Sequence, residues 1–289
     1  MSLQQSEQQT SSLETASEPV IQLQDAIPAA NDGDTDSSIG EETGSSTVSI
    51  SSSVLAYRKE NGRSYHALSD GTDEHPKAEV IGVDLSPIQP AFVPPNLTFE
   101  VDDLEKDWTW TQKFDFIFGR MMLGSFADLP RIIQVAFDNL EPGGYLELQD
   151  MSPPARSDDD TLLPDSYLSR WCNYCFEAGQ KLGRPIFPTT EYKNYLAAAG
   201  FENIVEVQQK WPTNPWPRDR KFKDLGAWSY ANIASGLDGL SLAYFTRGLG
   251  WTPEETRVFC AHTRKDIQNP KIHAYWPIYF VYGRKPLTG

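Results

Sequence analysis

Residues 114–148 read FDFIFGRMMLGSFADLPRIIQVAFDNLEPGGYLEL and contain the patterns of a buried strand, an amphipathic helix and a second strand. The run at 114–118 is almost entirely apolar, and residues 129–140 carry apolar side chains at helical spacing. Glu141-Pro142-Gly143-Gly144 predicts a helix stop and a turn before a strand at 145–148. Because short connections join these alternating elements, the stretch predicts an α/β fold with a mostly parallel sheet.

Two more strands are predicted on the N-terminal side of this stretch. Residues 78–83 (AEVIGV) form a short apolar run that ends at Asp84, which is typical of a buried parallel strand. Residues 97–101 follow the turn sequence Pro94-Pro95-Asn96 and predict the next strand.

The C-terminal half is predicted to be mainly helical. Thr252 before Pro253 is a strong helix start, because it combines an N-cap residue with proline at the first helical position. Pro277 places the last strand at a sheet edge or a bulge. The expected helices cover 165–182, 191–199 and 222–249, and the expected strands cover 204–208 and 272–282.

Composition separates an N-terminal tail from a folded domain. Residues 1–53 contain nine Asp and Glu, no Lys or Arg, and no aromatic residue. Such a segment cannot bury enough apolar surface to offset its ordering entropy, so we predict a disordered acidic tail over 1–53 and a folded α/β domain over 54–289. The tail is interpreted either as a plain solubilising extension or as a partner-binding or phosphorylated segment.

The overall charge and hydropathy exclude several classes of protein. A net charge of −15 over 289 residues argues against general nucleic-acid binding, which needs clustered Lys and Arg. The chain shows no apolar run of about 18 residues, so no membrane span is expected. The start, MSLQQSEQQT, is no signal peptide, and three cysteines fit a reducing compartment. These features predict an intracellular protein, cytoplasmic or nuclear, that is not secreted.

Acidic residues follow two of the predicted strands at their carboxyl ends. Asp84 ends the first strand, and Asp102 and Asp103 follow the second. Ligands of parallel sheets bind at the carboxyl ends of the strands, where a carboxylate can accept hydrogen bonds from both hydroxyls of a ribose. An acid on the neighbouring strand can accept one from an adenine amino group. Each acid taken singly fits a helix cap or a solvated turn better than a binding site.

Two segments taken together resemble the fungal LaeA-like methyltransferases, class I enzymes that use S-adenosylmethionine. They are VIGVDLSPIQPAFVPPNLTFEVDDLEKDW at 80–108 and the stretch from Phe114 to Asp150. Residues 52–68, the Trp- and Pro-rich stretch at 211–228 and the ending PIYFVYGRKP are similar to the same family. The pairing of GVDLSP with LEPGG-x-LE carries most of the specificity. The resemblance implies a Rossmann-like class I methyltransferase sheet and S-adenosylmethionine as the cofactor.

The resemblance also implies roles for individual residues. Asp84 matches the ribose-binding acid, Leu85 the neighbour that packs near the adenine, and Asp102-Asp103 the acidic pair beside the adenine. Phe118, Gly119 and Arg120 match the segment that faces the methionine end of the cofactor. No residue stands out as a catalytic base, which methyl transfer by in-line displacement does not require, because that reaction needs mainly positioning.

The chain departs from the family at its first strand. The family carries a glycine-rich loop of D-I-G-T-G-T-G type there, expected about 20 residues before the ribose acid and therefore around residue 64. Residues 60–66 read ENGRSYH, with no G-x-G and no apolar strand before them. The first strand, its loop and most of the first helix are therefore predicted to be missing, which leaves the sheet incomplete. The sequence is compatible with a degenerate methyltransferase and with a gene model that lacks an exon.

Other candidate residues point less clearly to chemistry. Cys172 and Cys175 form a C-x2-C, but no second pair follows, so no metal site is predicted and helix packing is favoured. The histidines are interpreted as structural or surface residues. The basic patch at 218–223, interrupted by Asp219, fits a solvated helix start better than a guide for an anionic substrate. Four aromatic residues fit a substrate pocket and core packing about equally: Trp211, Trp216, Trp228 and Tyr230.

Two functions from different classes follow from these features. The first is a methyltransferase with a compromised cofactor site that acts on a small aromatic secondary metabolite or a regulatory target. The second is a catalytically inactive family member that serves as an accessory or regulatory subunit and binds a protein partner through the tail or a face of the domain.

Overall fold

The computed structural model describes residues 21–23, 26–30, 58–60, 63–65, 77–87, 89 and 93–288. The chain divides into two compact units, one made of Met1–Asn31 with Trp110–Gly289 and the other of Asp32–Thr109. The two units are described separately below.

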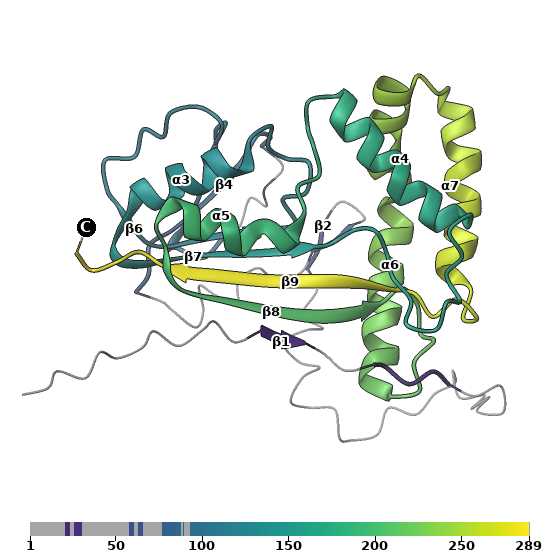
Figure 1. Ribbon diagram of the computed structural model, residues 1–289. Coiled ribbons are helices and arrows are strands. Elements are labelled where there is room, and N and C mark those ends of the chain that lie inside the picture. Colours follow the sequence, from purple (N-terminus) through teal and green to yellow (C-terminus); the bar gives the residue numbers. More distant parts are fainter. Residues whose placement is uncertain are drawn as a thin grey trace, which may run out of the picture. The chain divides into compact units, whose positions relative to one another are not determined.

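The larger unit contains a five-stranded sheet with the strand order β1-β8-β9-β7-β6 (Figure 1). β6 runs parallel to β7, and β1 runs parallel to β8, but β9 is antiparallel to both of its neighbours. The sheet is therefore less parallel than the sequence predicts, because the last strand of the chain enters its middle. The strands are β1 (Ile21–Leu23), β6 (Phe114–Arg120), β7 (Leu140–Met151), β8 (Glu202–Pro212) and β9 (Tyr275–Arg284).

The position of β9 corrects the expectation drawn from Pro277. That proline lies in a central strand, in register with Lys210 of β8, rather than at a sheet edge. The ladder between β9 and β7 ends one residue later, at the Met151–Ile278 pair. The Pro277 carbonyl accepts a hydrogen bond from the Ser152 amide at 2.7 Å. The strand tolerates proline because it lies near the start of β9, just beyond the ladder with β7.

β7 is also longer than predicted, because the Glu141–Gly144 segment lies inside the strand and not in a separate turn. The segment does change how β7 pairs with β6. Phe114 pairs with Leu140 and Phe116 with Tyr145, so the register shifts between these pairs. Gly143 has a φ of +89°, a left-handed conformation that glycine adopts at little cost. The predicted turn is thus an irregularity within one continuous strand.

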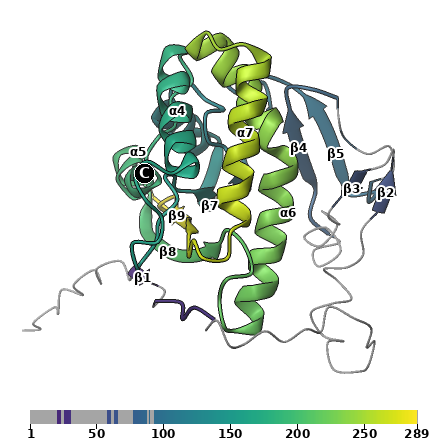
Figure 2. The same cartoon turned by 90° about the vertical axis from the view of Figure 1, so that its right-hand side faces the viewer.

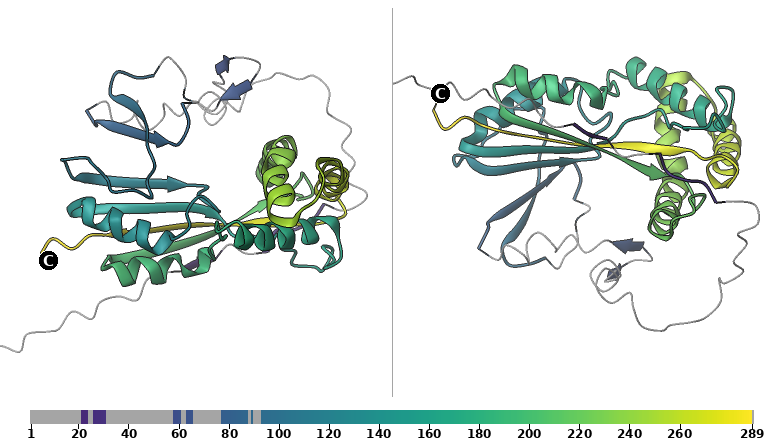
Figure 3. Two further views of the ribbon diagram at one scale, coloured as in Figure 1. Left: turned by 90° about the horizontal axis from the view of Figure 1, so that it is seen from above. Right: turned by 60° about the horizontal axis from the view of Figure 1, so that its bottom comes forward.

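The helices of the larger unit lie in two groups. α3 and α5 pack together along the sheet, and in Figure 3 they lie on the same face of it. α4, α6 and α7 pack with one another and with a π-helical turn, η2, at the end where β9 begins (Figure 2). The helices are α3 (Leu129–Asn139), α4 (Tyr167–Lys181), η1 (Thr189–Glu191), α5 (Tyr192–Ala199), α6 (Arg220–Ala243), η2 (Tyr244–Leu249) and α7 (Pro253–Gln268).

The second group of helices closes over an aromatic core. Its buried members include Trp171, Trp276, Phe245 and Phe259, which meet edge to face. Aromatic pairs prefer this arrangement, because the positive edge of one ring meets the negative face of the other. The core therefore joins α4, η2, α7 and β9 in one cluster.

The predicted start of α7 is confirmed in detail. The Thr252 hydroxyl accepts from the Glu255 amide at 3.1 Å, and the Glu255 carboxylate accepts from the Thr252 amide at 2.8 Å, which forms a capping box. The Glu255 carboxylate accepts a second bond from the Thr252 hydroxyl at 2.9 Å, and the two bonds that it accepts lower the pKa of Glu255.

Replacing Thr252 by alanine should destabilise the protein by about 1 kcal/mol, because the amide at the third helical position loses its acceptor. Chemical denaturation followed by circular dichroism measures this loss. Thr252→Ser keeps the hydroxyl and should stay close to the wild type. An equal loss in both variants would show that the cap does not carry the effect.

The smaller unit contains two separate strand pairs among its described residues. β4 (Val80–Asp84) and β5 (Leu97–Val101) are parallel, as the sequence predicts, and β2 (Arg58–Glu60) and β3 (Arg63–Tyr65) are antiparallel. Gly82 is packed closely by Phe99, whose ring would lie 2.4 Å from an added Cβ atom. Among the described strands, β4 pairs only with β5 and β6 only with β7, which agrees with an incomplete sheet.

Part of the predicted tail is folded. Residues 21–23 form β1 on the edge of β8, and Ile27 is buried. The Ala30 amide donates to the Trp216 carbonyl at 3.1 Å, and the Arg218 amide donates to the Pro28 carbonyl at 3.0 Å. Apolar residues within this acidic segment account for the difference, because composition averaged over 1–53 hides a short stretch able to pair with a strand. The rest of 1–53 lies outside the described residues.

Within the part of the chain that the structure describes, no helix is long and apolar enough to cross a membrane.

Candidate functional site

The acids predicted to bind a nucleoside lie together at one end of the β4–β5 pair. Asp84 is the last residue of β4 and is in register with Val101, the last residue of β5. The Asp102 amide donates to the Asp84 carbonyl at 3.1 Å, so the two strands leave the ladder side by side. The fold thus brings Asp84, Leu85, Asp102 and Asp103 to the carboxyl end of two adjacent parallel strands, where ligands of such sheets bind.

Each of these acids also shapes its own turn. One Asp84 oxygen accepts from the Ser86 amide at 2.9 Å, and one Asp102 oxygen accepts from the Asp103 amide at 2.7 Å. Asp103 accepts from the Glu105 amide at 3.1 Å and pairs with Lys106 at 3.6 Å. The turn-forming interpretation therefore holds for all three. It does not exclude ligand binding, because a carboxylate has two oxygens and can accept several hydrogen bonds.

Leu85, next to Asp84, presents an apolar side chain that is 68% exposed. An exposed leucine beside a carboxylate matches what a nucleoside needs, an apolar surface for the base next to acceptors for the sugar hydroxyls.

The other predicted residues lie in the larger unit, at the carboxyl end of β6. Phe118 is half exposed and stacks on Phe116, with ring centroids 6.3 Å apart. Gly119 lies over Leu148, which would approach an added Cβ atom to 3.0 Å. Arg120, the last residue of β6, is exposed. These three residues alternate across the strand, so Phe118 and Arg120 share one face and Gly119 faces the packed side.

A tight turn over residues 121–125 follows directly. Met121 has a φ of +54°, which non-glycine residues rarely adopt, and Gly124 has a φ of +68°. A Cβ atom on Gly124 would lie 2.0 Å from the Tyr244 hydroxyl, so only glycine fits there without displacing that ring. The Ser125 carbonyl accepts from the Arg184 guanidinium at 3.1 Å.

Asp150, which sequence reasoning missed, holds this turn from below. It is fully buried in β7, and its two oxygens accept from the Met122 amide at 2.6 Å and the Tyr192 hydroxyl at 2.8 Å. Burial raises the pKa of Asp150 to about 6, although both hydrogen bonds oppose this by favouring the charged form. The available signal was an acid two residues after Leu148, on the inward face of the strand, with no indication of its partner.

The place where the glycine-rich loop is expected holds a short hairpin. Glu60 of β2 pairs with Arg63 of β3, and Arg58 pairs with Tyr65. A parallel strand followed by a loop and a helix would not give this antiparallel pairing. His66, the last residue of the ENGRSYH segment, lies outside the described residues.

The cysteines pack as core residues. Cys172, Cys175 and Cys260 are buried in the same apolar cluster, and burial raises the pKa of Cys172 to about 12. Thiols held neutral in this way are poor metal ligands and poor nucleophiles. Among the described residues, no group of three or more His, Cys, Asp and Glu side chains could hold a metal ion.

The remaining candidates also have structural surroundings. Asp219 caps α6 by accepting from the Phe222 amide at 3.2 Å, as expected of a helix start. Trp216 is buried and donates from Nε1 to the Ala274 carbonyl at 2.8 Å, whereas Trp228 is 45% exposed. His262 stacks on Tyr167, and His273 pairs with Asp159; His75 lies outside the described residues. The four aromatic residues considered for a substrate pocket therefore do not share one environment.

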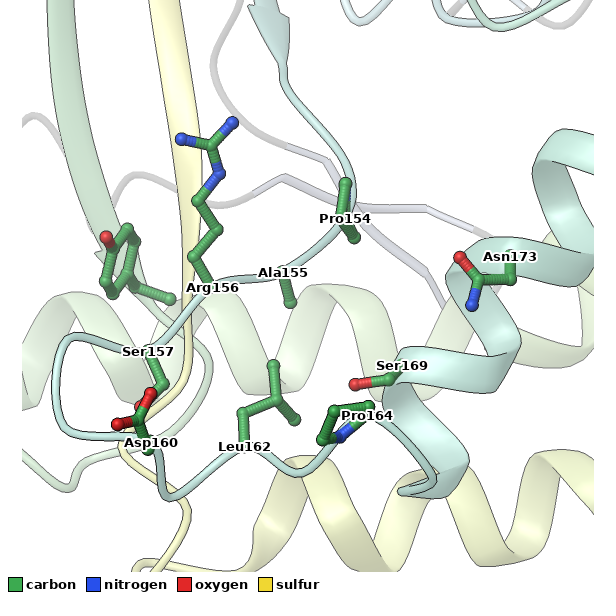
Figure 4. A pocket seen from close by; sticks show the side chains of 10 residues that line it. Pro154, Ala155, Arg156, Ser157, Asp160, Leu162, Pro164, Ser169 and Asn173 are labelled. Atoms are coloured by element: carbon green, nitrogen blue, oxygen red, sulfur yellow. The ribbon is translucent and has the colours of Figure 1, made fainter.

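An open pocket of about 400 Å³ lies between the loop after β7 and α4 (Figure 4). Pro154, Leu162 and Pro164 supply apolar surface. The Arg156 side chain points away from Leu162 and Pro164 in Figure 4. Because the polar groups of the lining do not converge on one point, the pocket does not define a binding site.

Acids at the carboxyl ends of two adjacent parallel strands are the arrangement expected of an α/β protein whose ligand binds at that edge of the sheet. A family model described as a methyltransferase domain matches residues 66–206. The chain is 36% identical to the probable methyltransferase tdiE of Emericella nidulans over 74% of its own length and 67% of that protein. It is 38% identical to the secondary metabolism regulator LAE1 of Cochliobolus heterostrophus over 75% of its own length and 72% of that protein.

These comparisons show that the chain belongs to the family of fungal LaeA-like methyltransferases, as its sequence patterns predict. The matched part spans about two thirds of the length of tdiE. Among solved structures, the chain is similar to a phosphoethanolamine N-methyltransferase of Haemonchus contortus in complex with S-adenosylhomocysteine. That similarity has a TM-score of 0.40 and 14% identity, and covers 72% of this chain and 43% of the other.

Proposed function

We propose that this chain is an S-adenosylmethionine-dependent methyltransferase of fungal secondary metabolism or its regulation, with a cofactor site reduced mainly to its nucleoside half. The observation that carries the proposal is the position of Asp84 and Asp102 at the ends of two adjacent parallel strands. Family membership supports the choice of cofactor over other nucleosides.

The described residues fit the nucleoside half of this cofactor. Asp84 and Asp102 each use one carboxylate oxygen in a turn, which leaves capacity to accept from ribose hydroxyls and an adenine amino group. Leu85 offers exposed apolar surface for the base. S-adenosylmethionine, when bound, supplies an electrophilic methyl group.

The fit to the methionine half is poorer. The hairpin of β2 and β3 stands where a glycine-rich loop would let the backbone approach the cofactor. Phe118, Gly119 and Arg120 are the described residues that we assign to this half, with Arg120 as a cation able to meet a carboxylate. A site with few methionine contacts is expected to bind the cofactor weakly and to turn over slowly.

The same hairpin favours the second candidate function, a catalytically inactive family member that acts as an accessory or regulatory subunit. In that case cofactor binding is lost, and the chain functions through a protein partner. The two functions predict different responses to the cofactor.

A thermal melt with S-adenosylmethionine should separate them. A ligand that binds only the native state adds about 2.7 kcal/mol at 100 times its dissociation constant, which raises the Tm by about 5 °C or more in a domain of this size. Asp84→Ala should abolish most of this shift, because the ribose hydroxyls lose their acceptor. Glu79→Ala, an exposed acid at the other end of β4, should keep it.

A cooperative melt that the cofactor does not move would contradict the methyltransferase proposal and support the accessory function. A shift that survives in Asp84→Ala would keep cofactor binding but refute this assignment of the ribose acid.

A further inference from the structure

The turn at 121–125 is held in a conformation that its own sequence does not favour. Met121 has a left-handed φ of +54°, which costs a non-glycine residue on the order of 1 kcal/mol. The Met121 amide donates to the Gln149 carbonyl at 2.9 Å, and this bond continues the ladder in which Arg120 is in register with Gln149. The next amide, Met122, leaves the ladder and finds a side-chain acceptor instead.

That acceptor is Asp150. Its exposure is 0%, and both of its oxygens are engaged, one by the Met122 amide at 2.6 Å and the other by the Tyr192 hydroxyl at 2.8 Å. Charged acceptors make the stronger hydrogen bonds, and a buried amide without a partner costs about 1–3 kcal/mol. Among the described residues, Asp150 is the acceptor of the Met122 amide, so its carboxyl group fixes the direction in which the chain leaves β6.

We propose that Asp150 is a positioning residue, which holds the 121–125 turn and thereby sets the orientation of Phe118–Arg120 at the methionine end of the cofactor site. The role toward the cofactor rests on the proposed function. Asp150 itself touches neither cofactor nor substrate, because it is fully buried beneath the turn. We call the hydrogen bond from the Met122 amide to Asp150 the lock on the turn. It is a property of the fold and can be tested without any ligand.

We expect the strength of the Met122 hydrogen bond to depend on the charge of Asp150, because an ionised carboxylate is the stronger acceptor. Its pKa is raised from 3.8 to about 6 by burial, while the Tyr192 and Met122 hydrogen bonds lower it. Around it lie Tyr192 on α5, Tyr279 on β9, and Arg184 beside the same turn. Burial raises the pKa of both tyrosines, so neither of them titrates between about pH 5 and 8.

We therefore expect the Met122 hydrogen bond and the free energy of unfolding of the whole chain to respond to pH in opposite directions. The raised pKa means that Asp150 contributes stability that is present below pH 4 and is lost as the pH rises through about 6. The Met122 hydrogen bond favours the ionised form, so this bond strengthens over the same interval. If Asp150 only stabilised the fold as a whole, the protection of the Met122 amide from exchange would fall together with the free energy of unfolding as the pH rises.

The experiment is amide hydrogen exchange by NMR on the full chain labelled with ¹⁵N-methionine. The chain has four methionines, and Met121, Met122 and Met151 are the internal ones. Protection of Met122, corrected for its intrinsic exchange rate, should rise on the order of tenfold from about pH 5 to 7.5. Met151, in the ladder with Ile278, serves as the internal reference.

Three variants sharpen the test. In Asp150→Asn the profile should be flat and Met122 protection near pH 7.5 should fall on the order of tenfold, because the acceptor is neutral at every pH. In Tyr192→Phe the profile should keep its shape, with a midpoint moved to higher pH, because a bond that stabilises the carboxylate is removed. Glu206→Gln, which removes another carboxyl with a pKa raised by burial, should leave the profile unchanged.

A flat wild-type profile, or equal Met122 protection in wild type and Asp150→Asn, would overturn the lock. If Asp150→Asn does not fold, an unchanged midpoint in Tyr192→Phe overturns it. The role toward the cofactor is tested by a second measurement, the affinity for S-adenosylmethionine. Asp150→Asn should weaken this binding on the order of tenfold, and equal binding by wild type and variant would refute the positioning role. If the wild type does not bind the cofactor, the proposed function fails, while the exchange profile still decides the lock.

Discussion

Replacing Gly226 by alanine is expected to destabilise the protein by about 3 kcal/mol and to lower its Tm by about 6–12 °C. Gly226 lies in α6 where the helix meets the backbone of residues 214–215. An added Cβ atom would lie 2.2 Å from the Asn214 carbonyl oxygen and 2.6 Å from its carbon. Backbone atoms cannot rotate away as the end of a side chain can, so the helix or the segment must move.

The opposing segment is itself held in place. Asn214 is 1% exposed and donates from Nδ2 to the Ile267 carbonyl at 2.8 Å, and its own carbonyl accepts from the Trp216 amide at 2.8 Å. Moving it would strain these bonds. The overlap therefore outweighs the gain of about 1 kcal/mol in helix propensity that alanine brings.

Gly236→Ala is the matched control, because that glycine lies in the same helix with open space around its missing Cβ atom. This variant should be more stable than the wild type by about 0.5–1 kcal/mol. Urea denaturation of both variants measures the difference. Similar stabilities for the two would refute the close approach of α6 to residues 214–215.

Replacing Trp276 by alanine is the second change with a large expected effect, a loss of about 3–5 kcal/mol. Trp276 is 1% exposed and lies in β9 at the centre of the aromatic core, with its ring 6.4 Å from that of Trp171 and edge-on to it. Truncation would leave a cavity that the central strand of a sheet cannot close, because its backbone is fixed on both sides.

Phenylalanine at the same position should be tolerated much better. The buried Nε1 of Trp276 has no hydrogen-bond partner among the described residues, so its removal relieves a desolvation cost. We expect Trp276→Phe to lose no more than about 2 kcal/mol, the cost of a smaller ring. Trp171→Phe is the variant to compare with Trp276→Phe, because it removes a hydrogen bond as well as part of a ring. Nε1 of Trp171 donates to the Ser241 hydroxyl at 2.8 Å. If Trp276→Phe were as unstable as Trp276→Ala, the ring would be acting through its polar atom.

Local patterns were sufficient to predict many elements. The α3 helix, the β4 and β5 strands and the start of α7 depend on residues close in sequence, such as Asp128 and Thr252 at the helix starts. The acids at strand ends were equally visible, because a carboxylate directly after an apolar run is a local feature. Which of them bind a ligand stays a prediction.

Contacts between distant residues could not be predicted in the same way. Asp150 and Tyr192 are 42 positions apart, and the residues next to each of them in the sequence do not indicate that the two form a hydrogen bond. The place of β9 between β7 and β8 depends on which strands can pair along their whole length, and this overrode the local preference of Pro277 for an edge.

The sequence by itself determined the identity of most strands and helices, the family, and the positions of the acids at the ends of β4 and β5, because hydrophobic period, capping residues and motif spacing are local. Only the tertiary structure decided the order of the strands, the pairing of residues 21–23 with β8 and the buried carboxyl beneath the turn after β6. These features arise when distant segments compete for the same backbone partners and when a buried polar group must find one.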